Sequence, residues 1–147
     1  MKALLTLALV FGVATAADDK KFDAEKMVGK WKLTGGKKAG SAVTDESKKG
    51  WYDITKDKFF IKGEDGKDMF VIEYTLDAKA SPAAVDMKIT KSPGDSANDS
   101  KGLGIVKVDG DKFEICYDPE GKKRPENFEG EKAFWFTFER MKEEKKK

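Results

Sequence analysis

The stretch 103-LGIVKVDGDKFEICY-117 holds two strand-like runs that meet at Asp109-Gly110. In the second run apolar and charged side chains alternate, so that Phe113, Ile115 and Tyr117 share one face. An Asp-Gly pair between such runs is a strong hairpin signal, because both residues tolerate the backbone of a tight turn. We therefore expect an antiparallel hairpin with one apolar face to bury.

Runs of the same kind recur along the chain, separated by turns rich in Gly, Asp, Asn, Pro and Lys, a pattern typical of barrels and sandwiches. We expect strands at residues 30–35, 50–55, 58–62, 68–76, 83–90, 103–108, 112–117 and 132–140. One short helical turn is expected at residues 22–28, capped by Asp23. Longer polar loops are expected at residues 36–49 and 92–102.

These strands define the fold class. Short turns make sequence neighbours pair antiparallel, and each strand has one apolar face. A meander of eight strands buries those faces, and loses its exposed edges, when it curls until the first and last strands pair. The alternative is a two-sheet sandwich, which usually needs long crossing connections. We predict an all-β fold, an eight-stranded antiparallel up-and-down β-barrel.

The N-terminus has the pattern of a secretory signal peptide. A basic residue at Lys2 precedes an apolar run over residues 3–13 and the small-x-small tripeptide Ala14-Thr15-Ala16. Charges follow from Asp18, too soon for a membrane-spanning helix. We expect a signal peptide at 1–16, an N-terminal segment at 17–28, a barrel at 29–140 and a charged tail at 141–147. The mature protein should be exported, periplasmic or extracellular, with no membrane span.

Charge and composition exclude several classes of function. The chain has 29 Lys and Arg residues interleaved with 27 Asp and Glu residues, which is a solvated surface and not a nucleic-acid footprint. It has no histidine, which removes Ser-His-Asp and Cys-His relays and makes a zinc site very unfavourable. The esterase-like Gly94-Asp95-Ser96 lies in a polar loop and is interpreted as a turn. We expect no enzyme, no metal site and no cofactor.

A single cysteine, Cys116, permits no intrachain disulfide. Because it follows Ile115 in a strand-like run, we predict a buried, inert thiol and a monomeric protein.

The ends of the predicted barrel resemble those of lipocalins. Gly29-Lys30-Trp31 opens the first strand and Arg140 closes the last. In lipocalins the tryptophan of a Gly-x-Trp motif sits at the closed end and an arginine of the last strand packs across it. The resemblance implies that Gly29, Trp31 and Arg140 close the barrel. An ordinary core tryptophan and a surface arginine are the alternative.

Residues 27–140 also resemble, more specifically, a family of small exported bacterial lipocalin-like domains of unassigned function. The similar stretches are residues 28–31, 54–59, 109–117 and 121–128. This resemblance implies a fold and an exported location, and it implies no reaction.

Two functions remain open. In the first, the barrel binds a small apolar molecule among inward side chains, the candidates being Phe59, Ile61, Phe70, Ile72, Val85, Met87, Phe113, Phe134, Phe136 and Phe138. The same residues would otherwise fill the barrel. In the second, a filled barrel is a protein or cell-envelope interaction module, with Trp51, Tyr52 and Trp135 facing outward or lining a rim.

The connection before the last strand carries a further structural prediction. Arg124, followed by Pro125, should hydrogen-bond loop carbonyls or a nearby acid and hold this connection, while Phe128 anchors it to the core.

Overall fold

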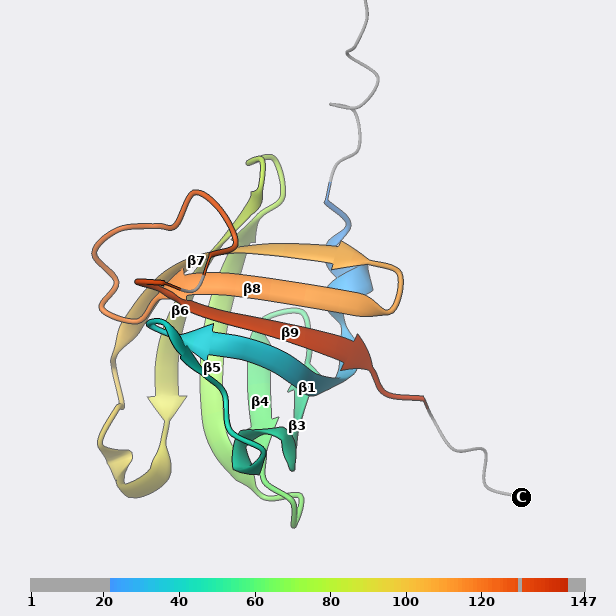
Figure 1. The fold of residues 1–147 in the computed structure, drawn as a ribbon, viewed down its shortest axis with the longest axis vertical. Helices are drawn as coiled ribbons and strands as arrows, with labels where there is room; N and C mark the ends of the chain where they lie inside the picture. Colours follow the sequence, from blue (N-terminus) through green and yellow to red (C-terminus); the bar gives the residue numbers. More distant parts are fainter. Residues whose placement is uncertain (1–21, 130, 143–147) are drawn as a thin grey trace, which may run out of the picture.

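The computed structural model describes residues 22–129 and 131–142. The expected signal peptide at 1–16, and the charged tail beyond residue 142, lie outside the described residues. Figure 1 shows the described part as a sheet that curls round on itself, with the N-terminal helical turn at one end.

Within the described residues the sheet has nine strands, one of them only two residues long. They are β1 Gly29–Lys38, β2 Ser41–Ala42, β3 Trp51–Ile54, β4 Lys58–Lys62, β5 Asp68–Asp77, β6 Ala83–Lys91, β7 Lys101–Asp109, β8 Lys112–Asp118 and β9 Phe134–Arg140. Three 3-10 helices complete the described elements: η1 Ala24–Met27, η2 Glu46–Lys48 and η3 Pro93–Asp95.

The sheet closes into a barrel. Strands β3 to β9 pair in sequence order, all antiparallel, and β1 pairs with both β3 and β9. With the short β2 set aside, eight strands form a closed up-and-down barrel, which confirms the predicted fold class. The helical turn is also confirmed, since Asp23 Oδ1 accepts a hydrogen bond from the Glu25 backbone N–H at 3.0 Å.

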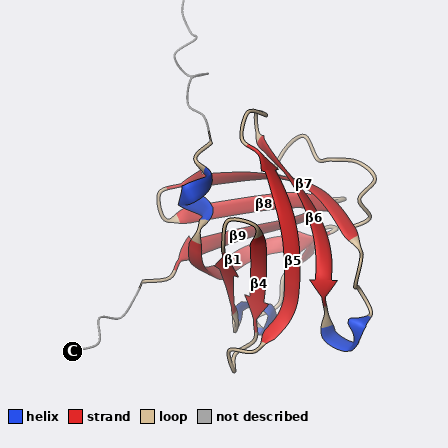
Figure 2. Cartoon of the chain, turned by 180° about the vertical axis from the view of Figure 1, so that it is seen from behind, coloured by secondary structure: helices blue, strands red, loops and turns tan. Residues whose placement is uncertain are grey.

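The two ends of the barrel differ. The short turns β3–β4, β5–β6 and β7–β8 lie at the end where β1 begins, together with η1. The longer connections, which include η2, η3 and residues 119–133, start from the opposite end (Figure 2). This arrangement follows from the alternating direction of an up-and-down meander, which places every second connection at the same end.

The first end is sealed by Trp31 and Arg140. Trp31 is fully buried, and its indole N–H donates to the Met27 carbonyl at 2.8 Å. The Arg140 guanidinium lies 4.2 Å from the centre of the Trp31 ring and donates to the carbonyls of Lys26 and Val28 at 2.7 and 3.1 Å. The arginine therefore covers the indole and ties the end of β9 to the helical turn.

Gly29 is required by this seal. A Cβ at Gly29 would lie 2.7 Å from Arg140 Nη1, and its φ of 135° falls where side chains are strained. Gly29, Trp31 and Arg140 therefore lie side by side at the closed end, as the resemblance to lipocalins implied.

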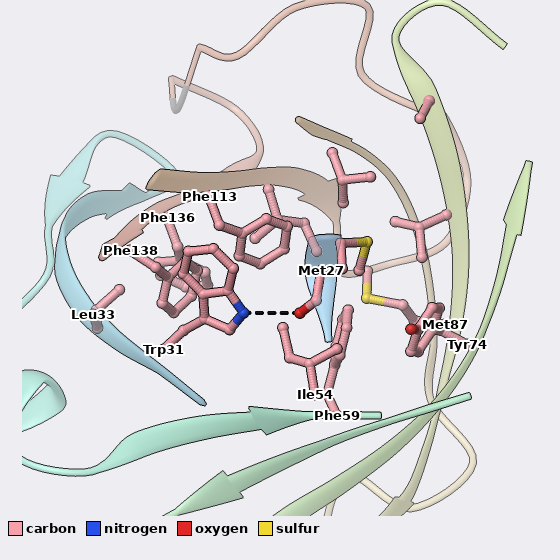
Figure 3. Packing of buried hydrophobic residues seen from close by; sticks show 14 residues of the cluster. Met27, Trp31, Leu33, Ile54, Phe59, Tyr74, Met87, Phe113, Phe136 and Phe138 are labelled. Atoms are coloured by element: carbon pink, nitrogen blue, oxygen red, sulfur yellow. Dashed lines mark hydrogen bonds between the residues drawn. The ribbon is translucent and has the colours of Figure 1, made fainter. Parts of the chain in front are cut away.

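An aromatic core rests on this seal. Figure 3 shows Phe113, Phe136 and Phe138 gathered beside Trp31. The same cluster also includes Ile54, Phe59 and Met87. The Phe113 ring lies 5.4 Å from the Trp31 ring and 5.3 Å from the Phe138 ring, between centroids. Aromatic contacts of this kind add to the stability gained from burial alone.

Most strand bounds differ from the sequence-based expectation by one or two residues at an end, and the largest difference is in β1. β1 continues to Lys38, through Gly36, into a stretch predicted to be loop, and then turns back through β2. A bulge between Leu33 and Gly35 lets this extension pair with β9. A Cβ at Gly36 would lie 2.1 Å from the Trp135 carbonyl oxygen, so the close pairing depends on glycine. β9 begins at Phe134, two residues later than predicted.

In the described part of the chain, no helix has the length and apolar character needed to span a membrane.

Replacing Arg140 tests the seal. We expect Arg140→Ala to lower the free energy of unfolding by about 2–3 kcal/mol, because two charge-assisted hydrogen bonds and the contact with the indole face are lost. Arg140→Lys should recover only part of this, since an ammonium group cannot stack and form both bonds in the same geometry. Urea denaturation measures both variants, and an unchanged stability of Arg140→Ala would refute the role.

Candidate ligand-binding cavity

The barrel contains a cavity of about 550 Å³ that opens at the end opposite the Trp31–Arg140 seal. Its mouth is lined by residues from the long connections and the strand ends next to them, among them Thr44, Glu46, Glu64, Ser100 and Pro119. The longer connections start from this end and supply part of the cavity rim.

The lower wall of the cavity is apolar. Leu33, Phe59, Met87, Phe113 and Phe138 line it, and each is less than a tenth exposed. These residues also belong to the core cluster that rests on Trp31. The core of the closed end is therefore the floor of the cavity.

The sequence-based candidates for ligand contact are largely brought together here. Nine of the ten candidates line the cavity: Phe59, Ile61, Phe70, Ile72, Met87, Phe113, Phe134, Phe136 and Phe138. Val85 does not line it and has no exposed surface. It lies two residues nearer the closed end than Met87 on β6, where the floor packs over it.

Sequence reasoning missed other wall residues, above all Tyr52 and Tyr117. Tyr52 was expected to face outward or line a rim, but it lies inside the barrel with its ring 4.6 Å from that of Phe138. Alternation was the available signal, since Tyr52 shares a face with Ile54 and Tyr117 with Phe113. Leu33, Met69, Ile89 and Ile115 also line the cavity.

The two tyrosines have perturbed acidities. Burial raises the pKa of Tyr52 and of Tyr117 well above the usual range. A negative charge on Tyr52 would raise the pKa of Tyr117 further. Both phenols are therefore neutral at neutral pH.

Positive charge gathers at the mouth. Lys38, Lys49, Lys62 and Lys101 line it, at strand ends or in the connections. Lys49 pairs with Glu46 at 3.1 Å and Lys62 with Asp68 at 2.5 Å. Within the described residues Lys38, Lys101 and Glu64 have no ion pair, so the lysines outnumber the acids of the rim.

The connection after β8, described at residues 119–129 and 131–133, passes over the outward side of β6, β7 and β8. Arg124 Nη1 donates to the carbonyls of Val85 and Gly104, each at 2.9 Å, and Nη2 to Asp86 Oδ1. Pro125, with Arg124, borders a depression of about 570 Å³ outside the barrel. That depression is open, carries acidic side chains, and its arginine is already paired, so the barrel interior is the better candidate site.

Phe128 does not anchor this connection to the core. Its ring is half-buried outside the barrel, with Lys107 Nζ 4.6 Å from the ring centre. Since Lys107 is an exposed residue of β7, the ring lies against the outer surface of the sheet, and the barrel wall separates it from the core.

The two tryptophans expected at the surface are half-buried. Trp135 donates its indole N–H to Glu114 Oε1 at 3.0 Å, and Trp51 lies against the β4–β5 turn at Gly66. Among the described residues, the large apolar side chains that are clearly exposed are Val28 and Met69, and Met69 belongs to the cavity mouth.

The described residues contain no group of three or more Cys, Asp or Glu side chains placed to hold a metal ion.

Cys116 lies under residues 119–133. It is fully buried, and its thiol donates to the Glu129 carbonyl at 3.6 Å. Burial raises the pKa of the thiol, so the reactive thiolate is scarce.

In comparisons with known proteins, no family model, curated protein or solved structure matches the chain significantly. The cavity and its lining are therefore the evidence on which a function rests.

Alkylation tests the state of Cys116. At about pH 8 we expect iodoacetamide to modify the folded protein at least about a hundredfold more slowly than the protein in guanidinium chloride. Ser96→Cys, at an exposed position, supplies the reactive control on the same fold. Mass spectrometry measures the rate of modification. Rapid modification of Cys116 in the folded protein would contradict the prediction and show that the covering connection opens freely.

Thermal unfolding tests Arg124. We expect Arg124→Ala to lower the midpoint by roughly 5 °C, because three hydrogen bonds from a charged group are lost. Lys123→Ala is the matched control, since Lys123 is exposed and its backbone N–H, not its side chain, binds Asp118. Equal midpoints for the two variants would contradict the anchoring role.

Proposed function

We propose that this protein is an exported, monomeric, non-enzymatic binding protein that holds one small apolar molecule inside its barrel. The observation that carries the proposal is the cavity of about 550 Å³, lined by aromatic and aliphatic side chains and open at one end. Small-molecule sites typically measure about 300–1,000 Å³ and are lined mainly by such side chains.

The barrel gives this cavity a stable wall. Every barrel strand is paired on both sides, so the cavity does not depend on the assembly of mobile loops. A ligand that enters a preformed site loses less free energy to ordering the protein, which favours binding. The sealed end prevents the ligand from passing through.

Export and the absence of catalysis are supported by the sequence. The signal-peptide pattern at residues 1–16 favours export. A chain without histidine, whose acidic residues show no spacing that singles out an acid and a base, favours binding over a reaction.

The second candidate, an interaction module with a filled barrel, has weaker support. The cavity argues against a filled interior. Trp51 and Trp135 would have been the surface anchors of such a module, but both are half-buried. Hot-spot aromatics at interfaces need accessible surface for a partner to bury.

Titration with N-phenyl-1-naphthylamine, a neutral apolar dye that fluoresces when shielded from water, tests the proposal. We expect saturable, stoichiometric binding. Ile72→Trp, which adds an indole to the cavity wall, should weaken binding at least about tenfold by filling volume. Val71→Trp is the matched control, because Val71 is the next residue of β5 and does not line the cavity.

Absence of saturable binding by the wild-type protein would defeat the proposal. An equal effect of Ile72→Trp and Val71→Trp would do the same, since the dye would then bind elsewhere.

A further inference from the structure

Two phenol groups line the cavity, and the Tyr52 ring rests against Phe138 of the floor. Tyr52 is the second residue of β3, which begins at the mouth, and Tyr117 is the second-last residue of β8, which ends there. In the closed sheet β1 and β9 separate β3 from β8, so the two tyrosines come from different parts of the wall. Phe113, four residues deeper than Tyr117 on β8, belongs to the floor.

Neither hydroxyl has a hydrogen-bonding partner within the part of the chain that the structure describes. Tyr74 shows the contrast, since its hydroxyl donates to the Thr55 carbonyl at 2.6 Å. Tyr52 and Tyr117 are enclosed by the barrel, yet half-exposed by surface, because the cavity itself reaches them. The two hydroxyls are therefore open to whatever occupies the cavity.

A ligand that enters the cavity takes the place of water at these two hydroxyls. Affinity is lost when the water is displaced by a group that cannot replace its hydrogen bonds, so a ligand with a hydrogen-bonding group is favoured. Each phenol hydroxyl can both donate and accept. A hydroxyl or a carbonyl on the ligand would satisfy either tyrosine.

The charges around the cavity indicate that this group is neutral. In the described residues, the cations that line the cavity are the lysines of the rim, and the floor is aromatic and aliphatic. A carboxylate bound on the floor beside Tyr52 would be desolvated with no cation among the floor residues, which is strongly unfavourable. The phenols themselves are uncharged at neutral pH, so they offer hydrogen bonds and no compensating charge.

We propose that the ligand is a small amphiphilic molecule whose apolar body lies on the aromatic floor and whose neutral hydroxyl or carbonyl group is hydrogen-bonded by Tyr52 and Tyr117. The inference rests on the ligand-binding function proposed above and specifies the chemistry of the ligand. The tyrosines select for a hydrogen-bonding group, while the floor supplies most of the affinity through burial of apolar surface.

Three probes with the same ring system test it: naphthalene, 2-naphthol and 2-naphthoate, each measured by displacement of N-phenyl-1-naphthylamine. In the double variant Tyr52→Phe/Tyr117→Phe we expect the affinity for 2-naphthol to fall about tenfold, and that for naphthalene to change less than about twofold. Each single variant should show part of this loss and guards against a folding defect in the double variant. Tyr74→Phe is the matched control, because its hydroxyl lies outside the cavity lining, and should leave both affinities unchanged.

The outcomes separate the inference from the function on which it rests. Equal losses for naphthalene and 2-naphthol would show that the tyrosines only pack, and would overturn the inference while leaving apolar binding intact. Tightest binding of 2-naphthoate by the wild-type protein would also overturn it, in favour of an anionic ligand at the lysine rim. Failure of wild-type protein to bind either the dye or naphthalene would defeat the proposed function itself.

Discussion

Pairing of the first strand with the last is the constraint on which the rest of this structure depends. Register between β1 and β9 places Trp31 opposite Arg140, so the pairing that closes the sheet also brings the guanidinium onto the indole. The arginine then bonds the carbonyls of Lys26 and Val28, which hold the helical turn across the end of the barrel. Closure of the wall and closure of the end are thus one event, and Gly29 is the residue whose missing side chain makes room for it.

The barrel is sealed at one end only, and its interior is filled near that end and hollow toward the other. Large rings crowd toward Trp31, where the Phe113 and Phe138 rings stack and exclude water. Toward the other end the strands are joined by longer connections, and the side chains no longer meet across the barrel. An eight-stranded barrel is just wide enough for its side chains to fill it. Here the aromatic and aliphatic side chains above the floor line the wall and leave a cavity between them.

The cavity combines three layers with different chemistry. The floor is apolar, the phenols of Tyr52 and Tyr117 add hydrogen-bonding groups to the wall, and lysines stand at the mouth. Outside the barrel, the connection after β8 covers Cys116 through Glu129 and ties β6 to β7 through Arg124, so its polar groups support the wall. The cavity lining and the support of the wall are in this way on opposite faces of the same strands.

The sequence by itself determined the strand series, its antiparallel order, the closed eight-stranded barrel and most of the cavity wall, because period-two alternation states which side chains share a face. It did not reveal that β1 runs on through Gly36 into an apparent loop, since a glycine- and lysine-rich stretch has no alternation and becomes a strand only when β9 offers its backbone. It misplaced Tyr52, Val85 and Phe128 for a related reason. Alternation gives the face of a residue but not its depth along the barrel, nor which side of the wall a long connection packs against. Only the tertiary structure decided how deep each side chain lies and which side of the wall a connection covers. Both depend on strand register and on contacts between residues far apart in the chain.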